Sequence, residues 1–151
     1  MEIKQFTEQY NESTNIFILS ILEGEFGHTN IPRPDLDDIS GFYQIDKGNF
    51  WLAIHDNKII GTIGLKDYRG LAYIKRMIVD REFRGKGVAQ DLLEVVINHC
   101  KDNGFSKIYL STSKNLVAAN KFYEKEGFEI VDALPKEIPS QIAQINYMKL
   151  I

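Results

Sequence analysis

Apolar residues follow two different periods along this chain. Short runs in which apolar residues alternate with polar ones, or follow one another without a break, are typical of β-strands. Seven segments of this kind are Met1–Phe6, Phe50–Ile54, Ile59–Asp67, Leu71–Val79, Lys107–Thr112, Phe128–Val131 and Ile145–Leu150. The run Phe50–Ile54 is apolar at every position, which is typical of a strand covered on both faces. The pattern therefore predicts a sheet built from these seven segments.

Three longer segments carry apolar residues at helical spacing, and they are Thr14–Glu25, Gly87–Cys100 and Ser113–Glu126. Ser13 precedes the first of them, so we expect it to be the N-cap of that helix. A glycine follows closely after each of the other two, where it would end the helix. The segment Asn30–Gln44 contains two prolines and is predicted to be a loop, with one short helix near Leu36–Phe42.

The order of these elements, β-α-(α)-β-β-β-α-β-α-β-β, indicates the fold class. Tight turns at His55–Lys58 and Arg69–Gly70 connect three consecutive strands into an antiparallel meander. The strand-helix-strand unit Leu71–Thr112 requires a parallel or nearly parallel pair, because the crossover helix returns the chain in the same direction. We therefore predict an α/β (α+β) fold in a single domain over residues 1–151, with a mixed, mostly antiparallel sheet and helices on both faces.

Length and composition are those of a soluble globular protein. The chain has 151 residues, of which 44% are hydrophobic and 26% are charged, so it needs no disulfide or metal to fold. The formal net charge is -3 and the pI is about 5.6. This charge argues against a nucleic-acid binder driven by its overall field, because such a protein needs a basic surface.

Targeting and metal-binding signals are absent from the sequence. Cys100 is the only cysteine, its position predicts a core residue, and the three histidines are far apart, so no metal site is indicated. The N-terminus has no basic and then apolar signal region, and no apolar run approaches the ~20 residues of a membrane span. We expect a cytoplasmic protein without a metal and without membrane contact.

The stretch Val79–Ala89 combines the end of a strand, a short polar loop and the start of a helix. The first turn of a helix has backbone N–H groups without partners and a partial positive charge, so it can bind an anion. Gly85 and Gly87 would let the backbone approach a phosphate closely, and Arg84 and Lys86 would add cationic donors. A pyrophosphate is the expected guest, although a solvated turn explains the same residues. The loop matches neither the P-loop nor the dinucleotide-binding pattern, which argues against kinase, NTPase and nicotinamide-cofactor functions.

Two motifs around this loop resemble those of one family, the GNAT acyltransferase superfamily. Its central motif is Gln/Arg-x-x-Gly-x-Gly/Ala, and the segment from Lys75 to Leu93 is similar to it, with Arg84, Gly87 and Ala89 at the motif positions. The run Phe122–Phe128, with the sequence FYEKEGF, is similar to a second recurrent signature. The two motifs lie at the usual separation for the family, and the predicted order of elements agrees over nearly the whole chain.

The resemblance implies a site for CoA. In the family, the strand before the loop and the strand after its helix splay apart, and the pantetheine arm of CoA lies between them. The residues implied to contact acetyl-CoA, the co-substrate, are Met77, Ile78, Val79, Arg84, Gly85, Lys86, Gly87, Val88, Ala89 and Asn115. A backbone N–H near Met77–Val79 would polarise the thioester carbonyl. The implied activity is transfer of acetyl from acetyl-CoA to a primary amine by direct attack in a ternary complex.

Tyr123 corresponds to the family tyrosine that protonates the departing CoA thiolate, and the alternative is that it only packs beside Phe122 in an amphipathic helix. Two positions depart from the family pattern. Where many members have an asparagine that contacts CoA, this chain has Leu116, with Asn115 as its neighbour. Where close relatives have a glutamate that relays the amine proton, it has Tyr73. The general base therefore stays open among Asp67, Tyr73, Glu25 and water.

The motifs do not determine the acceptor, which the resemblance implies to be a small-molecule or peptide amine. The variable segments that would shape its site are Glu23–Gln44 and Ala133–Ala143. Five acidic residues in the first segment would attract a cation or belong to a solvated loop, and they are Glu23, Glu25, Asp35, Asp37 and Asp38. Four aromatic residues would line a pocket or belong to the core, and they are Phe50, Trp51, Tyr68 and Tyr73.

Two other functions fit parts of the sequence. A catalytically idle acyl-CoA-binding module would keep the same loop, and the missing glutamate favours it, whereas Gly87 and Tyr123 favour an enzyme. A nucleotide-binding or nucleic-acid-binding module would bind polynucleotide in a salt-sensitive way, which the net charge of -3 argues against. Dimers are common in the family, and we expect the edge Ile145–Ile151 to be available for pairing in a homodimer.

Overall fold

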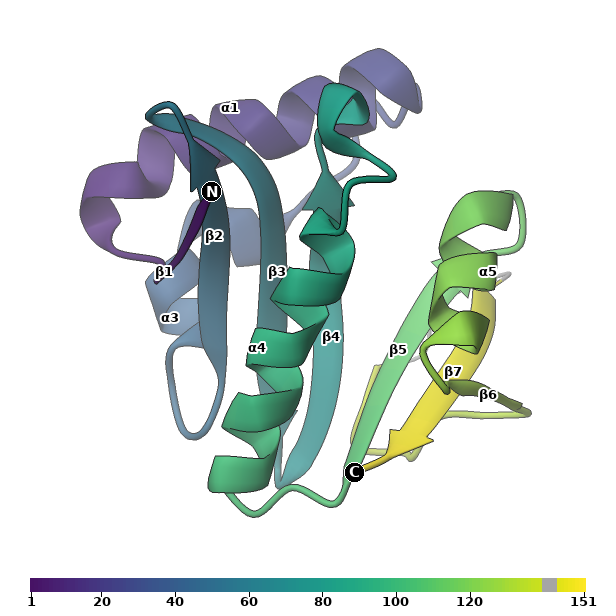
Figure 1. Ribbon diagram of the computed structural model, residues 1–151. Helices are drawn as coiled ribbons and strands as arrows, with labels where there is room; N and C mark the ends of the chain where they lie inside the picture. The colour runs from purple at the N-terminus through teal and green to yellow at the C-terminus, as the bar shows by residue number, and fades with distance from the viewer. Residues whose placement is uncertain (140–143) are drawn as a thin grey trace.

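Seven strands form one mixed sheet in the computed structural model, which describes residues 1–139 and 144–151 (Figure 1). The strands are β1 (Glu2–Gln5), β2 (Asn49–His55), β3 (Lys58–Tyr68), β4 (Leu71–Val79), β5 (Lys107–Ser113), β6 (Glu129–Val131) and β7 (Gln144–Leu150). Their order across the sheet is β1-β2-β3-β4-β5-β7-β6, and β4 with β5 is the parallel pair. The predicted fold class, with its antiparallel meander and its crossover, is confirmed.

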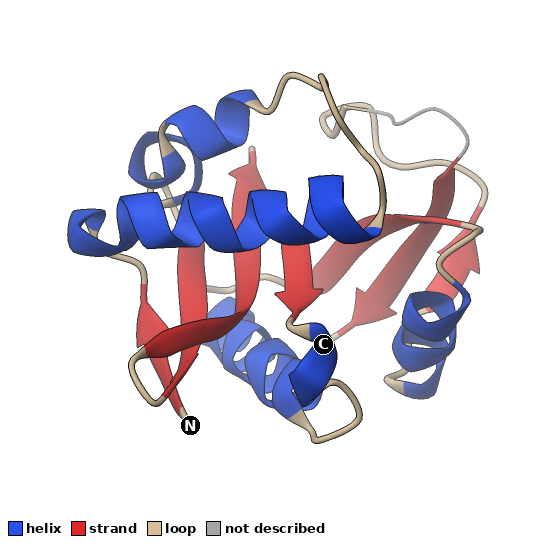
Figure 2. Cartoon of the chain, turned by 90° about the horizontal axis from the view of Figure 1, so that it is seen from above, coloured by secondary structure: helices blue, strands red, loops and turns tan. Residues whose placement is uncertain are grey.

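Helices cover both faces of this sheet (Figure 2). They are α1 (Asn11–Leu19), α2 (Pro34–Asp37), α3 (Ile39–Tyr43), α4 (Val88–Asp102) and α5 (Val117–Lys125), with the π-helix η2 (Ser20–Glu25) and the 3-10 turns η1 (Glu8–Tyr10) and η3 (Arg81–Phe83). Helix α1 lies across one face, and α4 and α5 lie on the other. No helix among the residues that the structure describes is long and apolar enough to cross a membrane.

Each face of the sheet has its own hydrophobic core. On one face, α1 and α3 bury Phe17, Ile18, Ile39 and Tyr43 against β2. On the other, α4 buries the predicted apolar stripe, which consists of Val88, Leu92, Leu93, Val96 and Cys100. Burial raises the pKa of the Cys100 thiol to about 12, so this cysteine is a core residue with little thiolate character.

Three sequence predictions about local structure are wrong. Ser13 does not cap α1, because the helix begins at Asn11 and the Ser13 hydroxyl instead donates to the Tyr10 carbonyl at 3.2 Å. Ser113 does not begin a helix, because it is the last residue of β5 and pairs with Gln144. Ile145–Ile151 does not form a sheet edge, because β7 lies between β5 and β6. In the last two cases, pairing with distant strands overrides the local pattern.

The parallel strands β4 and β5 pair over a short stretch and then diverge. Their register includes Ala72 with Ile108 and Tyr73 with Tyr109, and no later pair. Beyond Tyr73, the backbone groups of β4 on this side therefore have no ladder partner in β5. Figure 1 shows the two strands separated toward the ends where η3 and the start of α5 lie.

A β-bulge interrupts β4 at Arg76. Thr62 of β3 pairs with Ile78 and Gly64 pairs with Lys75, so two residues of β4, Arg76 and Met77, lie opposite one residue of β3. Arg76 has φ of +56°, a left-handed conformation that is uncommon for a residue with a side chain. The Thr62 hydroxyl donates a hydrogen bond to the Arg76 carbonyl at 2.8 Å.

The bulge changes which residues of β4 face each core. Ile74 and Met77, three positions apart, both pack against the core under α4, whereas Ile78 packs on the opposite face. Regular alternation would have put Ile74 and Ile78 on the same face. The bulge is therefore what turns Met77 toward the α4 side.

An ion pair holds the bulge to the short helix α2. The Arg76 guanidinium donates two hydrogen bonds to the Asp35 carboxylate, both 2.8 Å, and the Tyr43 hydroxyl donates a third at 2.6 Å. Asp35 is 3% exposed. Its burial raises the pKa of the carboxyl, but the hydrogen bonds and the charge of Arg76 outweigh burial, so the pKa lies below its ordinary value.

The contact between α3 and β3 gives a first prediction. A Cβ added at Gly64 would lie 2.7 Å from a Tyr43 ring carbon and 2.9 Å from a Phe50 ring carbon, and both rings are 0% exposed. We expect Gly64→Ala to lower the free energy of unfolding by about 1–3 kcal/mol, measured by urea denaturation. Gly24→Ala is the control, because a Cβ there meets no atom within 4 Å. Equal midpoints for the two variants would contradict this packing.

The ion pair gives a second prediction. At pH 7, Asp35→Asn should lower the free energy of unfolding by about 3 kcal/mol, because it leaves Arg76 uncompensated. The pKa of Asp35 is lower in the folded chain than in the unfolded chain, so the carboxylate stabilises the fold above the unfolded pKa of ~3.9. That contribution disappears as the pH falls through the lower folded pKa.

The measurement is urea unfolding of the wild type and Asp35→Asn between pH 7 and pH 3. The difference in the free energy of unfolding between the wild type and Asp35→Asn should become smaller below about pH 4. Asp37→Asn, on the same short helix but exposed, should match the wild type throughout. A difference that stays constant down to pH 3 would show that Asp35 does not act as a carboxylate.

Candidate functional site

A cavity of about 660 Å³ opens where β4 and β5 diverge. Its walls come from the end of β4, the loop before α4, the first turn of α4, and α5. Of the residues predicted to contact the cofactor, nine line it: Met77, Ile78, Val79, Arg84, Gly85, Gly87, Val88, Ala89 and Asn115. Tyr123 lines it as well, and Lys86 does not. The fold thus brings the two sequence motifs to one cavity.

The loop before α4 has the backbone geometry of an anion-binding turn. Gly85 has φ of +74° and Gly87 has φ of +86°, and Gly87 is the N-cap of α4 without a side-chain cap. At this end of the helix, the Asp91 N–H donates to the Gly87 carbonyl at 3.0 Å. The N–H groups of the preceding residues of the first turn have no intrahelical partner and can serve a ligand.

Open space surrounds both glycines. A Cβ at Gly85 or at Gly87 would meet no heavy atom of the described chain within 4 Å. The positive φ angles, rather than packing within the protein, therefore require glycine at these two positions. A side chain at either position would project into space that a bound anion can occupy.

Arg84 has a structural contact that the sequence did not predict. Its guanidinium donates to the Val79 carbonyl at 2.9 Å and makes two hydrogen bonds with the Glu25 carboxylate, one of them 2.8 Å. The hydrogen bond from Arg84 lowers the pKa of Glu25. Arg84 therefore ties the loop to β4 and to η2, and its charge is already paired. Lys86 is exposed, with its ammonium 5.4 Å from the centre of the Phe83 ring.

Tyr123 is buried within the cavity wall formed by α5. Its side chain is 5% exposed and lies edge-on to the rings of Phe122 and Phe128. Burial raises the pKa of the phenol, so it keeps its proton at neutral pH. Asn115 and Leu116 both line the cavity, so both residues at the position where the sequence departs from the family are adjacent to it.

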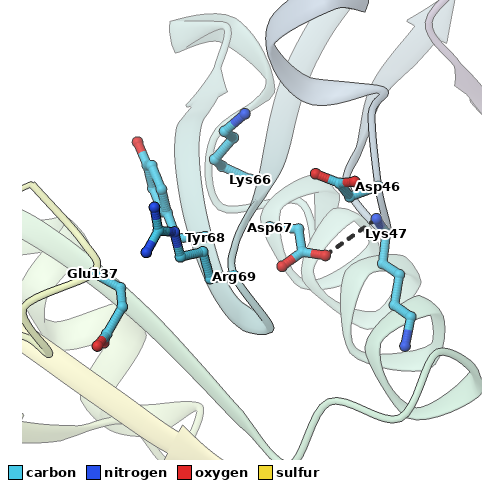
Figure 3. A pocket seen from close by; sticks show the side chains of 7 residues that line it. All are labelled: Asp46, Lys47, Lys66, Asp67, Tyr68, Arg69 and Glu137. Atoms are coloured by element: carbon cyan, nitrogen blue, oxygen red, sulfur yellow. Dashed lines mark hydrogen bonds between the residues drawn. The ribbon is translucent and has the colours of Figure 1, made fainter.

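The candidates for the general base lie in different places. Asp67 accepts from the Lys47 N–H at 3.2 Å and from the Gly70 N–H at 2.7 Å, at the far end of β3. It lines a separate groove of about 730 Å³ with Lys47 and five other residues, which Figure 3 shows. Glu25 lies in the ion pair with Arg84. Tyr73 is 4% exposed, and burial raises the pKa of its phenol.

A second cavity, of about 410 Å³, adjoins the bulge in β4. Ile74, Lys75 and Arg76 line it, whereas the next three residues of β4 line the larger cavity. The opposite wall comes from the segment around Arg33 and Asp35. One strand therefore contributes to two adjacent cavities, with the bulge as the boundary between them.

The segments predicted to shape the acceptor site fall differently around this second cavity. Part of Glu23–Gln44 lines it, but Asp35 is the one acidic side chain in its described wall. Of Ala133–Ala143, positions 140–143 lie outside the described residues, and the rest do not line this cavity. Among the four aromatic candidates, Tyr73 lines it, Tyr68 lines the separate groove, and Phe50 and Trp51 are core residues.

Sequence reasoning missed several residues of the two cavities. In the larger one they are Phe26, Phe83, Gln90, Leu116, Val117, Ala118, Ala119, Phe122 and Lys125. The helical period of α5 puts Ala119, Phe122 and Tyr123 on one face, which was a usable signal. Phe26 reaches the cavity through the π-helix η2, whose extra residue per turn is not legible in the sequence. Among the described residues, no three His, Cys, Asp or Glu side chains form a group that could hold a metal.

Comparison with known proteins agrees with this geometry. The sequence model described as "Acetyltransferase (GNAT) family" matches residues 15–128. The structure of an acetyltransferase of the GNAT family from Staphylococcus aureus Mu50 superposes with a TM-score of 0.91 and 34% identity, covering 99% of this chain and 98% of that chain. A Bacillus anthracis protein assigned as a streptothricin acetyltransferase, solved with acetyl coenzyme A, has a TM-score of 0.63 and 31% identity, covering 74% of this chain and 67% of that chain.

Among curated proteins, the N-acetylaspartate synthetase of Xenopus tropicalis is 33% identical over 109 residues, which cover 70% of this chain. The match covers 40% of that relative, so the chain spans less than half of its length. The chain belongs to the Acetyltransferase (GNAT) family, and the curated relatives that it matches include N-acetyltransferases and N-acetylaspartate synthetases.

Proposed function

We propose that this chain is an acyl-CoA-dependent N-acyltransferase that transfers acetyl from acetyl-CoA to a primary amine by direct attack in a ternary complex. The observation that carries the proposal is the N-terminus of α4, where Gly85 and Gly87 open onto the 660 Å³ cavity between β4 and β5. A helix N-terminus with exposed N–H groups suits a pyrophosphate. Three consecutive residues of β4, Met77–Val79, line the cavity that continues from it.

The residues present fit this co-substrate. Unpaired backbone groups of β4 beyond Tyr73 can hydrogen bond to the amides of the pantetheine arm. The arm would then take the place that a longer β5 would occupy beside β4. The apolar part of the cavity, with Ala119 and Phe122 of α5, suits its methylene groups. The Bacillus anthracis relative was solved with acetyl coenzyme A, which supports this assignment of the ligand.

The chemistry follows from the residues at the junction of the two cavities. The neutral amine attacks the thioester carbonyl carbon, the C–N bond forms, and the C–S bond breaks. A backbone N–H of Met77–Val79 would donate to the carbonyl oxygen as negative charge develops there. Tyr123, whose raised pKa keeps it protonated, would give its proton to the departing thiolate.

The proton released by the amine needs a separate acceptor. Asp67 lies at the far end of β3, where it accepts a hydrogen bond from the Gly70 N–H, and Glu25 is engaged with Arg84. We therefore assign proton removal to water in the second cavity, beside Tyr73. An amine that reaches the site already neutral needs no stronger base, because its nitrogen then loses a proton only after the C–N bond has formed.

A charge reversal at the helix N-terminus tests cofactor binding. Isothermal titration with acetyl-CoA should give binding by the wild type and a loss of at least about 100-fold for Gly87→Glu, because a carboxylate would occupy the space of the pyrophosphate. Gly104→Glu, at the other end of α4, is the matched control, since Gly104 also has a positive φ, +81°, and open space around it. Equal affinities for all three chains would sink the proposed phosphate site.

Removal of the Tyr123 hydroxyl tests whether this residue acts as the general acid. Tyr123→Phe should lower kcat by about 100-fold while the KM for acetyl-CoA stays unchanged, since a positioned acid contributes about 10²–10⁴-fold. Thiol release with an amine library is the assay. Tyr109→Phe, another buried tyrosine outside the cavity, controls for loss of a hydroxyl. An unchanged kcat would assign thiolate departure to solvent instead, and binding without thiol release from any amine would favour the idle module.

A further inference from the structure

The second cavity contains a lysine without an acidic partner. Lys75 lines it from β4 and is half-buried, with its ammonium 5.7 Å from the centre of the Phe42 ring on the opposite wall. No carboxylate of the described residues lies within 4.0 Å of this ammonium, and positions 140–143 hold no acidic residue. An ammonium in this situation has lost part of its hydration without gaining an ion pair.

The one carboxylate in the described wall of this cavity is already satisfied. Asp35 accepts two hydrogen bonds from Arg76 and one from the Tyr43 hydroxyl. Its charge is therefore neutralised by Arg76 at 2.8 Å, and it opposes Lys75 only at longer range. The acidic residue that the sequence offered for attracting a cation does not do so.

A third cation, Arg33, also lines the cavity. The Arg33 side chain is 9% exposed and donates to the carbonyls of His28 and Ile31, with the Glu23 carboxylate 3.8 Å away. Arg33, Lys75 and Arg76 thus line one cavity whose described wall holds a single carboxylate. In a chain of net charge -3, this cavity is locally positive.

The energetics of Lys75 favour an anionic guest. Burial lowers the pKa of this lysine and the charge of Arg76 adds to the effect, while Asp35 partly opposes them. A bound anion would restore the interaction that burial removes. Because Arg76 is paired and Arg33 has Glu23 nearby, one uncompensated charge remains, which matches a carboxylate better than a phosphate dianion.

The position of Lys75 relates this anion site to the transferred acyl group. Met77, two residues further along β4, lines the larger cavity. Two residues of a regular strand span roughly 6–7 Å, and this is an upper limit across the bulge at Arg76. A short acceptor with its carboxylate at Lys75 can therefore direct an amine toward the backbone of Met77. A cavity of about 410 Å³ is large enough for a molecule of this size.

We propose that the acceptor is a primary amine that carries a carboxylate, an amino acid, with the carboxylate bound by Lys75 in the second cavity. This inference rests on the proposed function for the acyl transfer, but the anion site itself is independent of it. The proposal names Lys75 as a specificity-determining residue. The acidic loop residues suggested a site that attracts a cation, whereas this cavity would bind the negatively charged carboxylate of the acceptor.

The test compares L-amino acids with their carboxamides, which keep the side chain and the amine but lack the carboxylate. For L-alanine and L-leucine against the corresponding α-carboxamides, we expect a kcat/KM about 10- to 100-fold higher for the acid, as for a hydrogen bond to a charged group. The comparison is conservative, because an α-amino amide has the less basic amine and is more often neutral. Thiol release from acetyl-CoA is the assay.

Lys75 variants locate the effect. Lys75→Met should remove the preference for the acid and leave the KM for acetyl-CoA unchanged, whereas Lys75→Arg should keep most of the preference. Lys58→Met, at the exposed first residue of β3, is the matched control and should behave as the wild type. Equal kcat/KM for acids and amides, or a preference that survives in Lys75→Met, would overturn the proposal.

A second readout needs no acetyl-CoA. In an NMR titration with the same pairs, the backbone amide of Lys75 should shift on addition of the amino acids and not on addition of the carboxamides. No shift with any amino acid would overturn the anion site even if the chain acetylates other amines. A shift at Lys75 in a chain that does not bind acetyl-CoA would support the anion site and refute the proposed transfer instead.

Discussion

The arrangement of both cavities depends on the bulge at Arg76 and on the ion pair that holds it. A left-handed φ at a residue with a side chain is unfavourable, and here a hydrogen bond from Thr62 and two from Arg76 to Asp35 offset it. The bulge turns Met77 toward α4, while Lys75 remains on the opposite face. The same strand can therefore present backbone to one ligand and a cationic side chain to another. Without the ion pair, neither the direction of β4 beyond Lys75 nor the wall of the smaller cavity would be fixed.

Divergence of β4 from β5 gives the larger cavity its chemistry through the backbone. Where the ladder ends after Tyr73, backbone groups of β4 lose their protein partners, and the first turn of α4 supplies further unpaired N–H groups. Unpaired groups in a cavity are costly unless water or a ligand satisfies them. A long ligand with both amide and phosphate groups meets both needs at once. Side chains contribute less here, since Arg84 is tied to Glu25 and Lys86 points outside the cavity wall.

Much of this arrangement could be predicted from the sequence, because it depends on local pattern. The apolar stripe of α4, the two hairpins and the glycines before α4 each follow from a few neighbouring residues. What could not be predicted depends on partners distant in sequence. Ser113 lies in a strand because it pairs with Gln144, and β7 is internal because β6 pairs with its far side. The bulge is specified by the register between β3 and β4, and nothing in the letters around Arg76 indicates a positive φ there.

The charged residues show most clearly why the local sequence pattern did not predict the acceptor side of the site. Five acidic residues between Glu23 and Asp38 suggest a negative surface, yet three have basic partners and a fourth caps a helix. Glu23 lies near Arg33, Glu25 binds Arg84, Asp35 binds Arg76, and Asp38 accepts from the Gly41 N–H. The partners of Glu25 and Asp35 lie far outside the acidic run, at Arg84 and Arg76, so these two ion pairs are a property of the fold. In the described wall of the smaller cavity, the charge left without an ion-pair partner is that of Lys75, a residue that the sequence placed inside a motif concerned with the other ligand. The sign of the field in a cavity is therefore set by which charges the fold leaves without partners, and not by which charges are most numerous nearby.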